Sequence, residues 1–141
     1  MVRPGEGPAS RRYVGALATV LAGSAVPYGY TVTVWTSGVM LIRLRGLPSP
    51  GHVFLFMAGA VGAFGLLGLV VRLTAVAPLE ARSHAFVRIG MIQFIAVAAA
   101  LGAATLIAHI HSPLAWPLGS FAATATYLLL VAIELSVAAA R

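Results

Sequence analysis

The stretch YVGALATVLAGSAVPYGYTVTVWTSGVMLI, from Tyr13 to Ile42, decides the fold of this chain because it contains 30 residues and no charge. As a straight helix rising 1.5 Å per residue it would be about 45 Å long, whereas the hydrocarbon core of a bilayer is about 30 Å thick. Such a segment crosses a membrane only if it tilts, kinks or continues into the headgroup region.

The second half of this stretch, from Ser24 to Gly38, is polar for a membrane segment. Pro27 has no N–H to donate to the carbonyl of Gly23, so we expect a kink there, with the following chain angled or locally unwound. The candidate lining residues next to it are Tyr28, Tyr30, Thr31 and Thr33. Two interpretations stay open: these hydroxyls line a cavity at a broken helix, or they satisfy the backbone groups that the proline frees.

Composition places the chain in the membrane class. Hydrophobic residues make up 60% of the 141 residues and charged residues 9%, whereas soluble domains carry about 25% charged residues. There is no cysteine, which excludes disulfides and thiolate sites. The nine Lys and Arg positions are all arginines and, against three glutamates, give a net charge of +6, but the arginines lie at the ends of apolar segments. We therefore interpret the charge as membrane topology and expect no nucleic-acid partner.

Four apolar segments predict an all-α, polytopic integral membrane protein with four transmembrane helices in a compact bundle. An irregular cytoplasmic tail at residues 1–12 would precede a transmembrane domain at 13–141, with spans at 13–42, 53–72, 88–110 and 117–140. Seven arginines would lie on the face that holds both termini, and Arg43 and Arg45 on the other. This asymmetry predicts a protein of the plasma membrane, the inner membrane of the cell, with both termini in the cytoplasm.

The two connections expected on the outer face resemble each other. Residues 41–45 and 106–111 each contain Leu-Ile followed by two basic residues, and each is followed by Pro-x-x-x-Phe, at 50–54 and 117–121. The chain can therefore be read as two tandem two-helix hairpins, an arrangement found in some transporters. Alternatively, proline and basic residues simply recur where apolar helices are joined.

Small residues recur at helical spacing in three of the segments. In lipid, such faces let helix backbones approach closely, within one bundle or between copies of a chain. The three faces are Gly15, Thr19 and Gly23 in the first segment; Gly59, Gly62, Gly65 and Gly68 in the second; and Ala96, Ala100, Ala104 and Ala108 in the third. The glycine face winds around its helix, so we expect two different neighbours to approach it.

Glu134 is the strongest candidate functional residue, because a carboxyl deep inside a membrane span is rare and costly. We expect it to face the bundle interior. Arg72, about 7.5 Å away along the helix axis by residue count, or a tyrosine hydroxyl is the predicted partner. The alternative is an unpaired carboxyl that takes up a proton, as a proton or cation site would.

A basic rim is expected at the outer ends of the spans, built from Arg43, Arg45, His52, His109 and His111. If these residues lie near one another, the rim would suit anionic lipid headgroups or an anionic solute. On a helix, His109 and His111 would point about 200° apart and could not share a ligand unless the helix had already ended. We expect no metal and no cofactor, and we expect membrane lipids as partners.

The sequence contains no nucleophile with an adjacent base, no nucleotide-binding loop and no paired carboxylates, so we expect no enzyme. Two function classes remain. The first is an oligomeric transport or channel protein for a small solute or ion, which Pro27, its polar surroundings and Glu134 favour. The second is a non-catalytic accessory or scaffold subunit that binds a larger membrane complex through its small-residue faces.

Overall fold

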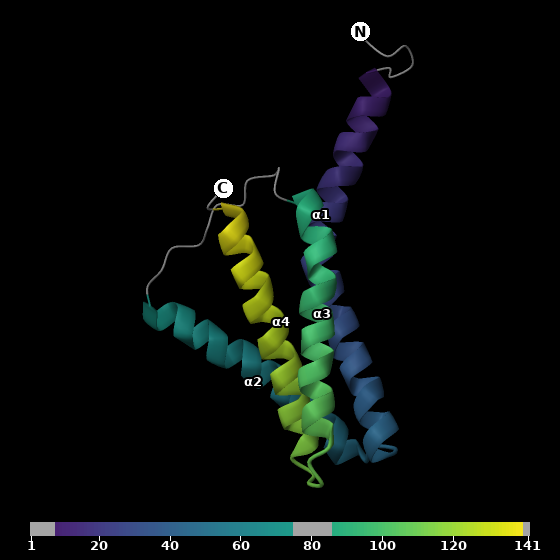
Figure 1. Ribbon diagram of the computed structural model, residues 1–141, viewed down its shortest axis with the longest axis vertical. Helices are drawn as coiled ribbons and strands as arrows, with labels where there is room; N and C mark the ends of the chain where they lie inside the picture. Colours follow the sequence, from purple (N-terminus) through teal and green to yellow (C-terminus); the bar gives the residue numbers. More distant parts are fainter. Residues whose placement is uncertain (1–7, 75–85, 140–141) are drawn as a thin grey trace.

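The structure, a computed structural model, describes residues 8–74 and 86–139, with the side chains of 27–73, 93–134, 136 and 137. Four helices form this part of the chain: α1 (Pro8–Arg45), α2 (Pro50–Thr74), α3 (Phe86–Ala108) and α4 (Ala115–Ala139). They run alternately in opposite directions, so the connections 46–49 and 109–114 meet at one end (Figure 1). The predicted all-α fold is confirmed.

The helix limits differ from the predicted ones by a few residues. Because α1 begins at Pro8, the predicted irregular tail is wrong for residues 8–12, and residues 1–7 lie outside the described part. The second, third and fourth helices begin two or three residues before the predicted spans, and α3 ends at Ala108, so His109 and His111 follow the helix. The predicted stripe at Gly15, Thr19 and Gly23 lies outside the described side chains.

Local capping explains the ends at the first connection. Gly46 adopts φ of 82° just after the last residue of α1, and its N–H donates to the carbonyl of Ile42 at 2.8 Å, the left-handed C-terminal cap that glycine favours. The N-cap of α2 is Ser49, whose Oγ accepts from the His52 N–H while its own N–H donates to His52 Nδ1. This is a capping box with histidine in place of glutamate, and Pro50 fills the first helical position.

Pro27 lies inside α1 without ending it. The expected local unwinding is wrong, because the helix is continuous from Pro8 to Arg45. The ribbon nevertheless changes direction between the purple first half of α1 and its blue second half (Figure 1). The proline therefore lies in a bowed helix rather than at a break.

Helix α4 is the centre of the fold, since it packs against the other three helices, while α3 also packs against α1. Ala96, Ala100, Ala104 and Ala108 are all buried in α3, which confirms the predicted alanine stripe. The buried residues of α1 follow the same four-residue spacing: Gly29, Thr33, Ser37 and Leu41. Small side chains on both helices thus allow close packing, as membrane helices commonly do.

Helix α2 packs mainly on α4 near the connection end, and its second half diverges from α4 (Figure 1). The bundle is therefore less compact than expected. Gly59 is in tight contact, because an added Cβ would overlap the carbonyl oxygen of Pro117 and the hydroxyl of Ser120. At Gly65 and Gly68 a Cβ would meet nothing within 4 Å. A Cβ at Gly62 would be in ordinary contact with Phe121 of α4 at 3.9 Å, so within the described residues the first two glycines of the groove face α4 and no second neighbour approaches the last two.

The proposed sequence repeat is not matched by equivalent packing. Leu41 is fully buried, whereas its counterpart Leu106 is 74% exposed. In the first hairpin α1 packs on α3 and α4, while in the second hairpin α3 and α4 pack along each other. The two halves of the chain therefore have different structural roles.

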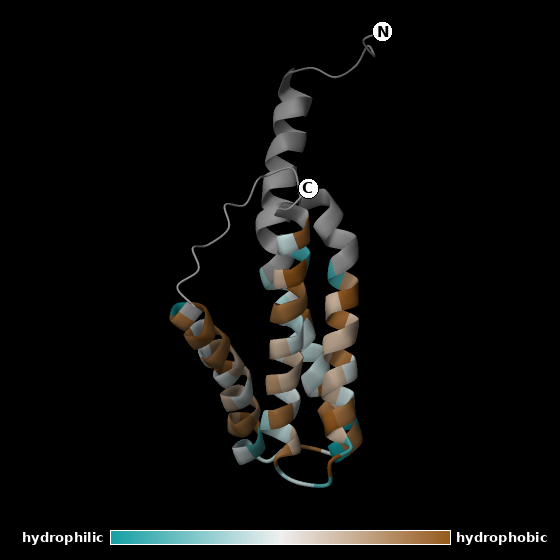
Figure 2. Cartoon of the chain, turned by 60° about the vertical axis from the view of Figure 1, so that its left-hand side comes forward, coloured by the Kyte–Doolittle hydropathy of each residue, from teal (hydrophilic) through white to brown (hydrophobic). Residues whose placement is uncertain are grey.

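Two segments of the described chain, Pro50–Leu73 and Ala115–Glu134, are long and apolar enough to cross a membrane, and Gln93–Ala108 is a shorter apolar helix. Large apolar side chains cover much of the outside. Phe54 and Phe94, for example, are 71% and 76% exposed, and Figure 2 shows hydrophobic residues along the outer surfaces of the helices. Exposed apolar surface of this extent is typical of contact with lipid or with other proteins.

Candidate functional site

A line of polar residues runs along the core-facing side of α4. It consists of Ser120, Thr124, Tyr127 and Glu134, and we call it the α4 polar face. Their spacings of four, three and seven residues place them on one side of a helix. Ser120, Thr124 and Tyr127 are buried, and Glu134 is half-buried. A largely apolar helix thus carries polar groups on its core-facing side from its first turns to its last third.

Tyr127 belongs to a polar junction of three helices. Gln93 Nε2 on α3 donates to the Tyr127 hydroxyl on α4 at 2.5 Å, and both residues are buried. On α1, a Cβ added to Gly29 would overlap the Gln93 amide and the Tyr127 hydroxyl. The absence of a side chain at Gly29 is therefore what lets this polar pair lie against α1.

An aromatic cluster closes one side of the junction. The ring of Tyr30 lies edge-on to Phe64 with centroids 5.1 Å apart and is tilted against Tyr127 at 6.1 Å. Such arrangements are the ones aromatic pairs favour. The cluster brings residues of α1, α2 and α4 into contact beside the Gln93–Tyr127 hydrogen bond.

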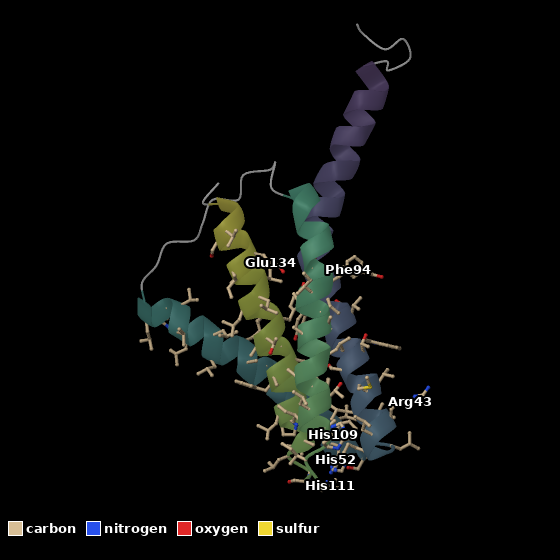
Figure 3. The ribbon with its side chains drawn as sticks, viewed as in Figure 1. Arg43, His52, Phe94, His109, His111 and Glu134 are labelled. Atoms are coloured by element: carbon tan, nitrogen blue, oxygen red, sulfur yellow. The ribbon has the colours of Figure 1, made fainter. Side chains whose placement is uncertain are left out.

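Glu134 extends from α4 toward α3, two turns beyond Tyr127 (Figure 3). Its Oε2 atom is buried and finds no hydrogen-bond partner in the described part of the chain, and the same is true of Thr124 Oγ1. The predicted pair with Arg72 is not formed, because Arg72 is exposed on the diverging half of α2. A buried oxygen without a partner is costly for a charged carboxylate, far more than for a neutral one.

The candidate residues next to Pro27 do not converge on one path. Tyr28 and Thr31 are exposed, whereas Thr33 is buried. The Thr31 and Thr33 hydroxyls donate to the carbonyls of Pro27 and Gly29 at 2.9 and 2.8 Å. Hydroxyls that bond to the preceding turn of their own helix are a common way to satisfy backbone groups in membrane helices. Between the two interpretations left open by the sequence, this geometry favours the structural one.

The residues of the basic rim lie at the connection end, where Figure 3 shows Arg43, His52, His109 and His111. Arg45 Nη2 donates to the carbonyl of Ser112 at 3.1 Å, which ties the two connections together. His52 stacks on the buried Trp116 at 5.4 Å, and His109 Nδ1 lies 2.8 Å from the carbonyl of Thr105. Among the described residues, no three His, Cys, Asp or Glu side chains are grouped to hold a metal ion.

The sequence interpretation missed Gln93, Thr124 and Tyr127. Gln93 is the only carboxamide in the chain and lies in an otherwise apolar segment, which is a signal that composition alone provides. The α4 polar face is likewise visible as a helical spacing of polar residues that ends at Glu134.

Comparisons with family models, with curated proteins and with solved structures found no match, so the site is interpreted from its own chemistry.

Proposed function

We propose that this chain is a multi-pass membrane protein with four crossings and cytoplasmic termini, and that it carries protons across the membrane. The arginine asymmetry, the four apolar segments and the exposed apolar surface support the topology. Helices α1, α3 and α4 pack closely through small residues. Transport therefore requires either an oligomer or a separation of the helices at one of these contacts.

The observation that carries the proposal is the buried Oε2 of Glu134, which has no hydrogen-bond partner among the described residues. A proton satisfies such an oxygen directly, whereas a metal ion would need several further ligands. The described residues hold no group of three acidic, histidine or cysteine side chains that would supply them. The ion best suited to this carboxyl is therefore the proton.

The α4 polar face supplies the remaining groups of the proposed path. Tyr127, Thr124 and Ser120 continue from Glu134 toward the connection end, and hydroxyls both donate and accept protons. Val131 lies between Glu134 and Tyr127 on this face and is buried. Proton passage across this apolar gap requires water or a movement of the helices, so we expect transport to be slow.

The experiment is proton uptake by liposomes that contain the purified protein and a pH-sensitive dye, driven by an imposed membrane potential. We expect uptake in the wild type and none in Glu134→Gln, which keeps the shape of the side chain but cannot release a proton. The control is Glu80→Gln, which removes one of the other two carboxyls of the chain and should leave uptake unchanged. Equal uptake in the wild type and Glu134→Gln would refute the proposal.

A second function, an accessory subunit of a larger membrane complex, rests on a different observation. Gly65 and Gly68 lie on the diverging half of α2 with open space around them. A partner helix that packed there would find the small residues that close helix contacts require. Native mass spectrometry from detergent tests this function, since a bound partner that Gly65→Leu removes would support it. A lone chain or a homo-oligomer that Gly65→Leu leaves intact would contradict it.

A further inference from the structure

The segments that form the connection end contain basic residues and no acidic residue. The three acidic residues of the chain are Glu6, Glu80 and Glu134, and none lies within 41–54 or 106–121, the segments that form this end. Two arginines and three histidines therefore stand without an acidic residue in either segment. A cluster of this kind attracts anions through its summed field.

The two arginines have guanidinium N–H groups that make no hydrogen bond to the described residues. A guanidinium has five N–H groups, and among the described residues the hydrogen bond of Arg45 is the one to Ser112. That bond fixes the position of the Arg45 side chain at the surface and leaves most of its N–H groups available to a ligand. Arg43 is exposed and extends away from the bundle (Figure 3). Planar arginine forks of this kind match the oxygens of a phosphate group.

Exposed apolar side chains lie between these cations. Leu44, Leu47 and Leu114 are 45%, 91% and 59% exposed, and both candidate spans, Pro50–Leu73 and Ala115–Glu134, begin at this end. A soluble anion gains nothing from neighbouring leucines. A lipid surface does, because leucines enter its acyl region while arginines meet its phosphates.

We propose that Arg43 and Arg45, which point about 200° apart on α1, each bind the phosphate group of a separate anionic phospholipid at the connection end, with neighbouring leucines in the acyl region. The inference rests on the membrane placement proposed above but not on proton transport, because lipid binding is measured without any flux. The proposed partner of the connection end is thus a negatively charged lipid.

Native mass spectrometry of the protein from detergent, with added phosphatidylglycerol or phosphatidylcholine, tests the site. We expect tighter binding of phosphatidylglycerol, and about fivefold weaker binding for each arginine removed in Arg43→Gln and Arg45→Gln. The matched control is Arg72→Gln, which removes the same charge at the other end of α2 and should leave this binding unchanged. Arg43 makes no described hydrogen bond, so Arg43→Gln tests the site even if Arg45→Gln impairs folding.

Three outcomes would overturn the proposal. The first is equal binding of the two lipids, and the second is equal loss of lipid in Arg43→Gln and Arg72→Gln. The third is full competition by inorganic phosphate at the concentration of the lipid, which would show that the site takes a free anion and that the leucines contribute nothing. Weakening of the binding by added salt is expected in the supporting case, since exposed charges are screened over about 10 Å at 0.1 M salt.

Discussion

Gln93 Nε2 donates a hydrogen bond to the Tyr127 hydroxyl at 2.5 Å, and both groups lie directly against the backbone of Gly29. Residues from three different helices therefore meet at one buried polar contact. Because the alanine stripe of α3 supplies close packing but little directionality, we infer that this contact sets the register of α1, α3 and α4.

Gly29→Ala should destabilise the protein, because its Cβ would overlap the Gln93 amide and the Tyr127 hydroxyl. Overpacking of this kind typically costs about 1–3 kcal/mol. Thermal unfolding in detergent measures the effect. The control is Gly102→Ala on the exposed side of α3, where a Cβ meets nothing within 4 Å and stability should stay equal or rise. Equal melting of both variants and the wild type would count against the junction.

A double-mutant cycle with Gln93→Leu and Tyr127→Phe should show a favourable coupling energy of about 1 kcal/mol, the scale of hydrogen bonds between membrane helices. Tyr127→Phe alone leaves the buried Gln93 amide without this acceptor. The free energy of unfolding should therefore fall in this single variant by more than the coupling energy. Reversible unfolding in mixed detergent gives the four free energies. Strictly additive effects would mean that the two residues act independently.

The capping box of α2 predicts a specific ranking at His52. His52→Glu should retain or improve stability, since glutamate is the usual third residue of this box, whereas His52→Ala should lose about 1 kcal/mol. Stacking on Trp116 is lost in both variants, so the difference between them reports the cap. Thermal unfolding distinguishes the two, and an alanine variant as stable as the glutamate one would refute the assignment.

Much of the packing could be predicted from single segments. The alanine stripe at 96, 100, 104 and 108 is visible as a four-residue spacing, and the structure buries all four side chains. The glycines at 65 and 68 show the limit of this reasoning. A small-residue face says that a neighbour can approach, but not that one is present, and here α2 diverges from the bundle.

The junction at Gly29 was beyond such reasoning for a related reason. The contact depends on the relative register of three helices, which no pattern within one helix specifies. The pair of Glu134 with Arg72 was expected because an arginine side chain can cover much of their difference in depth of about 7.5 Å, yet depth does not determine whether two helices stay together. Gln93, by contrast, was recognisable as a lone amide in an apolar segment.

The proposed topology predicts the labelling of two cysteine variants by a membrane-impermeant maleimide in intact cells. Ser49→Cys, in the connection between α1 and α2, should react, because that connection is proposed to lie outside. Ser10→Cys should react only after the membrane is permeabilised. The reverse pattern would show that the protein is inserted with its termini outside.

The central claim is that Glu134 holds a proton inside the bundle, and infrared spectroscopy of the protein in lipid at neutral pH tests it most directly. The difference spectrum between the wild type and Glu134→Gln should contain the carbonyl stretch of a neutral carboxylic acid, because none of the described residues gives the buried Oε2 a partner that would stabilise a charge. The Glu80→Gln variant serves as the control and should retain that band. A difference spectrum that instead contains the paired bands of a carboxylate at Glu134 would contradict the account.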